Sequence, residues 1–127
     1  MTQMEAVKAY KAAEALYQQR LDWKVAKRIS KIVEKLRPAF LFQVEQESLI
    51  FDDYPKLDRA TGRISFKTPE EKAEAERQVK EIDAKIKELG ATDAEIDLTP
   101  YDFPEDAKCE ITGEQVDALK GIINFPE

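Results

Sequence analysis

The side chains that could do chemistry in this chain are carboxylates and one cysteine, because the sequence contains no histidine. Histidine is the commonest general base and metal ligand, and every Ser–His or Cys–His nucleophile requires it. Cys109 lies between Lys108 and Glu110, so only a lysine could activate its thiol, and we interpret it as a structural or incidental cysteine.

Two groups of carboxylates are the only candidates for metal ligation. One consists of Asp52 and Asp53, and the other of Asp93, Glu95 and Asp97. Neither group has the spacing of a calcium-binding loop, and the four glycines form no phosphate-binding loop. An acid-pair glycosidase would need an aromatic-lined cleft, of which the sequence gives no sign. We therefore expect a protein that is not an enzyme and that has no catalytic residue, metal or cofactor.

A helix predicted from Asp22 to about Val44 carries the most asymmetric charge in the chain. At 100° per residue, one sector of this helix is apolar and a roughly opposite sector is basic. The apolar sector holds Val25, Ile29, Ile32, Val33, Leu36 and Phe40. The basic sector, which we call the basic stripe, consists of Lys24, Lys27, Arg28, Lys31 and Lys35. The stripe is either a solvated face or an electrostatic contact with an acidic protein or a nucleic acid.

Local signals mark the start and the middle of this helix. Asp22 suits an N-cap, since its carboxylate can accept an unpaired backbone N–H. Pro38 removes a donor and crowds the carbonyl four residues before it, so we expect a kink or a break there. Phe40, Leu41 and Phe42 then follow consecutively, which one apolar sector cannot accommodate. Either the chain is buried on several sides at this point, or Phe42 points at a partner.

The net charge of −6 conceals opposite charges in two parts of the chain. Residues 1–44 carry nine bases and four acids, a net charge of +5, so the remaining residues carry −11. Surfaces of opposite sign favour self-association or a charged protein partner over uniform nucleic-acid binding. Direct binding of nucleic acid is therefore not expected.

The acidic part contains a segment that we call the acidic tail. Acidic and aliphatic residues alternate over 95–98, which predicts a short strand, and two prolines then hold aromatic residues in an extended loop. The candidate partner-binding residues of the tail are Glu95, Asp97, Tyr101, Asp102 and Phe103. Such carboxylates can imitate a nucleic-acid backbone and occupy the basic cleft of a nuclease, although solubility alone also explains them.

A further helix is predicted over 68–89. Thr68, Pro69 and Glu71 form a typical helix start, and Gly90 is a typical helix end. The candidate oligomer seam on this helix consists of Val79, Ile82 and Ile86. Two heptads are fewer than an independent coiled coil needs, so the seam either packs within the chain or joins a homodimer.

The fold predicted from these patterns is a single α+β domain over 1–127 that is mainly helical. Thr2 and Glu5 have capping-box spacing for a first helix that runs to about Gln19 and forms a hairpin with the long kinked helix. Residues 56–67 predict a β-hairpin around Gly62, and Thr112 begins a short helix. The third helix and a small antiparallel sheet, made of the 56–67 hairpin and the 95–98 strand, complete the fold.

The apolar runs are too short to cross a bilayer, and the first residues, MTQMEAVKAYK, lack the apolar block of a signal peptide. A single cysteine also fits a reducing compartment. The sequence thus favours an intracellular protein without a membrane partner.

The order of motifs resembles that of small uncharacterised proteins from phages and prophages of Gram-positive bacteria. The resemblance spans nearly the whole chain and rests on the segments AYKAA, KVAKRISKIVEKL, DRATGRISF, EIDL and ITGEQVDALK. It implies a phage-encoded protein in the cytoplasm of a bacterial host, and it assigns no catalytic residue.

Three functional hypotheses follow from the charge layout and this resemblance. The first is a non-enzymatic phage protein that acts through protein–protein contacts. The second is an acidic inhibitor of a bacterial defence or nucleic-acid enzyme, either anti-CRISPR-like or a DNA mimic. The third is a virion assembly or tail accessory component that uses the 75–89 seam for oligomers.

Overall fold

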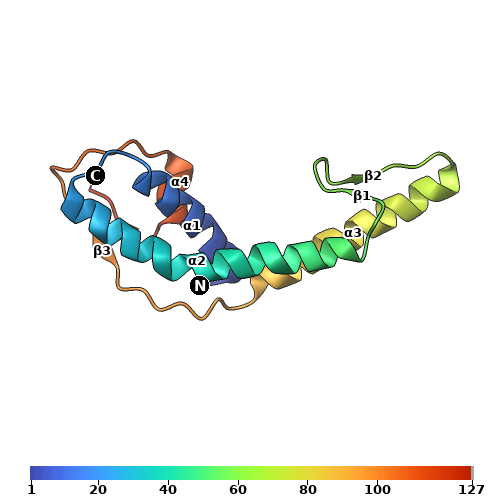
Figure 1. Cartoon of the computed structure of the whole chain (residues 1–127), viewed down its shortest axis with the longest axis horizontal. Helices are drawn as coiled ribbons and strands as arrows, with labels where there is room; N and C mark the ends of the chain where they lie inside the picture. The colour runs from blue at the N-terminus through green and yellow to red at the C-terminus, as the bar shows by residue number, and fades with distance from the viewer. Residues whose placement is uncertain (127) are drawn as a thin grey trace.

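The computed structural model describes residues 1–126, which form a rounded part and a long projection (Figure 1). The rounded part, which we call the head, comprises residues 1–40 and 92–126. The projection, which we call the arm, comprises residues 41–91. One helix, α2 (Trp23–Asp52), runs through both.

The head is built on a hairpin of α1 (Gln3–Tyr17) and the first half of α2, as predicted. The capping box is present, since the Thr2 hydroxyl accepts the Glu5 N–H and the Glu5 carboxylate accepts the Thr2 N–H. These hydrogen bonds lower the pKa of Glu5. Asp22 caps α2 by accepting the Lys24 N–H.

The helix α2 continues through Pro38, so of the two alternatives expected there, a kink or a break, the break does not occur. A proline inside a helix removes one backbone hydrogen bond, and Pro38 is exposed, where water can solvate the carbonyl that loses its donor. Gln3 supports the next turn by donating from its side-chain amide to the Ala39 carbonyl. The ribbon changes direction in its turquoise middle, which fits a bend rather than an interruption (Figure 1).

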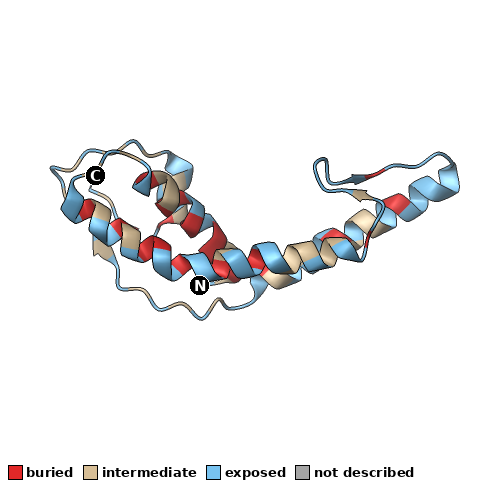
Figure 2. Cartoon of the chain, viewed as in Figure 1, coloured by how far each residue is buried: buried red, intermediate tan, exposed pale blue. Residues whose placement is uncertain are grey.

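The main hydrophobic core lies entirely within the head. Its largest fully buried apolar side chains are Leu16, Ile29, Leu36 and Leu119, contributed by α1, α2 and the turn after α4 (Gly113–Ala118). The Tyr10 ring stacks on Phe40, with 4.5 Å between the ring centroids. Figure 2 shows buried residues concentrated between α1 and the first half of α2, and fewer of them along the arm.

The arm pairs the second half of α2 with α3 (Pro69–Ala91), and a short hairpin connects them. The hairpin strands β1 (Leu57–Asp58) and β2 (Arg63–Ile64) are antiparallel, and Gly62 takes the positive φ of 71° that the turn requires. The start of α3 confirms the prediction, since Thr68 is the N-cap and Pro69 is the first helical residue. The end does not match the prediction, because Gly90 stays helical and α3 ends at Ala91.

The predicted strand over 95–98 is wrong. The Asp93 side chain accepts the Glu95 N–H, and Glu95 takes a φ of 55°, so the chain turns instead of extending beside a partner strand. The second small sheet is parallel and pairs β3 (Tyr101–Asp102) with β4 (Ile123–Asn124). The α+β, mainly helical fold class is nevertheless confirmed.

Candidate interaction surfaces

All five residues of the basic stripe are exposed on the head half of α2. Two of them contact the acidic tail of the same chain. The Lys35 ammonium donates to the Asp97 carbonyl at 3.3 Å, and the Arg28 guanidinium lies 5.1 Å from the centroid of the Tyr101 ring. The structure therefore brings the basic stripe and the acidic tail together along one edge of the head, although they were predicted from the sequence as separate surfaces.

The acidic tail is only partly available at the surface. Glu95, Asp97 and Asp102 are exposed, and Tyr101 is half-buried, which raises the pKa of its phenol. Phe103 is buried, so its predicted role as a surface contact is wrong. Its N–H donates to the Asn124 carbonyl at 2.8 Å, which directs the side chain into the core against Phe125. Phe103 thus anchors the tail to the head.

The predicted oligomer seam on α3 is used within the chain. Ile82 is buried, while Val79 and Ile86 are half-buried. The helix α3 contacts α2 along the arm, and it also contacts β2. These contacts cover the apolar side of α3, which is the packing alternative considered from the sequence.

A hydrogen-bonded tyrosine fastens the end of α2 to α3. Tyr54 is buried, and its hydroxyl contacts the Glu81 carboxylate at 3.0 Å and the Lys85 ammonium at 2.9 Å. The same ammonium lies 4.9 Å from the centroid of the Tyr54 ring. The contact with the hydroxyl raises the pKa of Lys85. This cluster holds the outer part of the arm together without a large core.

Large apolar side chains are exposed along the arm. They are Leu41, Phe42, Val44, Leu49 and Phe66. Among them, only Phe42, which is 48% exposed, was considered as an outward-pointing residue from the sequence. Leu49 lies seven residues after Phe42 and therefore on the same side of α2, a repeat that the sequence already contained.

Exposed basic residues and exposed apolar residues lie on one strip of α2, which we call the outer face. Its residues recur at intervals of three and four and are all exposed. They are Lys24, Lys27, Lys31, Lys35, Pro38, Phe42, Glu45, Leu49 and Asp52. Bases occupy the head half of this face, and acids and apolar residues occupy the arm half.

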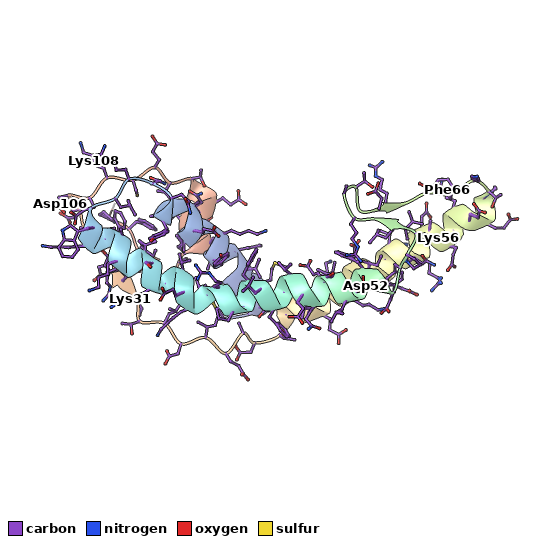
Figure 3. The ribbon with its side chains drawn as sticks, viewed as in Figure 1. Lys31, Asp52, Lys56, Phe66, Asp106 and Lys108 are labelled. Atoms are coloured by element: carbon purple, nitrogen blue, oxygen red, sulfur yellow. The ribbon has the colours of Figure 1, made fainter. Side chains whose placement is uncertain are left out.

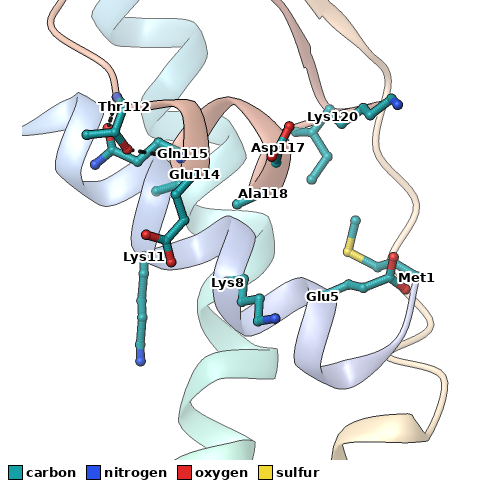
Figure 4. A pocket seen from close by; sticks show the side chains of 12 residues that line it. Met1, Glu5, Lys8, Lys11, Thr112, Glu114, Gln115, Asp117, Ala118 and Lys120 are labelled. Atoms are coloured by element: carbon teal, nitrogen blue, oxygen red, sulfur yellow. Dashed lines mark hydrogen bonds between the residues drawn. The ribbon is translucent and has the colours of Figure 1, made fainter.

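A groove with a volume of about 770 Å³ lies between α1 and α4 on the head (Figure 4). Its apolar floor includes Ala12, Ala118 and Ile122, and charged side chains of both signs stand on its rim. In Figure 4 the labelled Lys11 side chain extends away from the groove. The rim thus presents mixed charge and no convergent set of reactive groups.

Residues 1–126 contain no group of three or more side chains that could hold a metal ion. In the same residues, no helix combines the length and the apolar character needed to cross a membrane. Cys109 is half-buried, and burial raises the pKa of its thiol.

Comparisons with protein-family models, with curated proteins and with solved structures find no match for this chain.

Proposed function

We propose that this chain is a non-enzymatic binding protein that acts through protein–protein contacts made by its arm. The observation that supports this function is the exposure of Leu41, Phe42, Val44, Leu49 and Phe66 on a projection that contributes nothing to the buried core of the head. Exposed apolar side chains on one side of a helix, such as Phe42 and Leu49, are costly in water and commonly mark interaction sites. The arm thus has the composition of a surface that is covered in a complex.

The charges next to these apolar residues support recognition of a protein. Acidic and basic groups at the edge of an apolar contact steer partners and select among them. The arm half of α2 carries only acids, whereas α3 carries both signs. This mixture suits a protein surface better than it suits the uniformly negative backbone of a nucleic acid.

A phage origin is supported by the sequence resemblance alone. For a phage protein, a role in virion assembly agrees with a projecting arm that exposes apolar side chains. The inhibitor hypothesis has less support, because the exposed acids of the tail lie beside Arg28 and Lys35, and this edge of the head is not uniformly negative.

An affinity capture from a bacterial lysate tests the proposal. The wild-type chain serves as bait beside an arm variant, Val44→Ser/Phe66→Ser, and a head control, Trp23→Ser, whose side chain is 68% exposed. We expect a retained protein that survives a high-salt wash and is lost with the arm variant only. Equal retention of the protein by these three baits would contradict a function carried by the arm. So would a protein that is lost with a fourth bait, the basic-stripe variant Lys27→Glu/Lys31→Glu, and retained by the arm variant.

A further inference from the structure

The outer face of α2 has opposite charges on its two halves. Before Pro38, α2 has six bases and one acid, and after Pro38 it has three acids and no base. The bases before Pro38 are Lys24, Lys27, Arg28, Lys31, Lys35 and Arg37, and the acids after it are Glu45, Glu47 and Asp52, with Asp53 as the C-cap. An unbroken helix thus carries a reversal of charge at its exposed midpoint.

These charges are arranged symmetrically about Pro38. Every seventh residue of the outer face reads Lys24, Lys31, Pro38, Glu45 and Asp52, so two bases precede the proline at the distances at which two acids follow it. Residues seven apart lie on the same side of a helix. Turning a second copy of this face end over end therefore places Lys31 opposite Glu45, and Lys24 opposite Asp52.

The centre of the face is apolar and exposed. Phe42 lies on the face four residues after Pro38 and is 48% exposed, and Leu41, at the border of the face, is 56% exposed. In an antiparallel pair, both copies would contribute these two side chains around the same axis. Apolar contact at the centre of an interface supplies affinity, and charged pairs around it fix orientation.

The contacts within the chain leave Lys31 and Glu45, the charges closer to Pro38, available for a second copy. Arg28 and Lys35 lie on the side of the face that contacts the acidic tail, and Asp52 pairs with Arg59. Among residues 1–126, neither Lys31 nor Glu45 makes an ion pair. Figure 3 shows Lys31 on the head part of α2 and Asp52 at the far end, so the charges of opposite sign are well separated within one copy.

We propose that the outer face of α2 binds the same face of a second copy of this chain, antiparallel about Pro38. Such a contact is isologous, so each pair occurs twice: Lys31 of either copy meets Glu45 of the other. The inference extends the proposed function by naming one partner of the arm. It leaves Val44 and Phe66, which lie off the outer face, free for another protein.

Charge reversal at Lys31 and Glu45 tests both the contact and its orientation. We expect the wild type to sediment as a dimer, and Lys31→Glu and Glu45→Lys each to raise the dissociation constant by about tenfold or more, since each creates two like-charge pairs. The double variant Lys31→Glu/Glu45→Lys restores both pairs and should dimerise again. An equimolar mixture of the two single variants should form heterodimers for the same reason.

Lys87→Glu, an exposed reversal on α3, is the matched control and should leave the dissociation constant unchanged. A wild type that stays monomeric at the highest concentration reached would overturn the proposal. So would a double variant that stays as dissociated as the single variants, because an antiparallel pairing of positions 31 and 45 requires the exchange to restore both ion pairs. A monomer that still captures a protein through Val44 and Phe66 would refute this inference alone and leave the proposed function standing.

Discussion

Gly90 of α3 lies against Met4 of α1, so closely that a Cβ atom on Gly90 would come within 3.2 Å of the Met4 Cβ atom. Beside it, the Gln3 N–H donates to the Thr92 carbonyl at 2.7 Å, and the Ala94 N–H donates to the Met1 carbonyl at 3.0 Å. The arm is therefore joined to the head at a second place, in addition to the continuous helix α2.

Gly90→Val should destabilise the protein by about 1–3 kcal/mol, because the added carbons overpack the contact with Met4. Urea denaturation followed by circular dichroism measures the loss. Ala91→Val changes the exposed neighbouring residue of the same helix and should cost less. Equal losses in the two variants would show that α1 and α3 do not approach closely at Gly90.

Gln43→Met should stabilise the protein by about 1–3 kcal/mol. Gln43 is buried, and within residues 1–126 its side-chain amide has no hydrogen-bond partner, so the native residue bears a desolvation cost that methionine avoids at similar volume. The midpoint of thermal unfolding reports the change, with the half-buried Gln46→Met as control. A lower midpoint for Gln43→Met would indicate that the amide has a partner in solution, such as a bound water.

Tyr54→Phe should cost about 0.5–1.5 kcal/mol, because Glu81 and Lys85 lose their contacts with the hydroxyl. Amide hydrogen exchange should accelerate in the hairpin and the first half of α3 and stay unchanged in the head. Tyr17→Phe, at an exposed site, controls for loss of a hydroxyl. Faster exchange throughout the chain would argue against a local role.

The contact with Tyr54 also predicts a pH dependence. It raises the pKa of Lys85 above the ordinary value of 10.5, so the stabilisation is complete below pH 10.5 and is lost as the pH rises through the higher value in the folded protein. Lys85→Met should therefore destabilise the arm at neutral pH and make little difference at strongly alkaline pH. A difference of constant size across this range would contradict the linkage.

Cys109 should react slowly with a disulfide reagent such as Ellman's reagent. Burial raises the pKa of its thiol above 9.0, which lowers the fraction of reactive thiolate at pH 8. The rate should be lower than that of a free cysteine peptide at pH 8 and should still increase above pH 9. A rate equal to that of the peptide, or one that levels off below pH 9, would show that the thiol is not protected.

The helix starts could be predicted because a cap depends on residues only a few positions apart. Thr2, Asp22, Thr68 and Thr112 all cap the helices that the sequence assigns to them. The role of Gly90 could not be predicted in this way, because it depends on Met4, which is remote in the sequence and close in space. The strand expected over 95–98 failed for a related reason, since alternation shows which faces differ but not whether a partner strand is present.

The exposure of the basic stripe followed from its position opposite the apolar sector of α2. Burial of Phe103 did not follow, because it depends on the pairing of β3 with β4, whose residues lie over 20 positions apart. Apart from Phe42, the exposed apolar residues of the arm were missed because apolar residues are expected inside by default, and their exposure depends on how thin the arm is. Function through protein contacts remains a prediction.

The continuity of α2 has a mechanical consequence. Thirty residues at a rise of about 1.5 Å each make a rod of about 45 Å that begins in the head and ends beside the hairpin. Because no loop interrupts the rod and Gly90 secures its neighbour to α1, the arm cannot swing as a flexible tether does. A force applied at the hairpin would tilt the arm and the head together. Two proteins bound at the opposite ends of α2 would be kept at a set spacing.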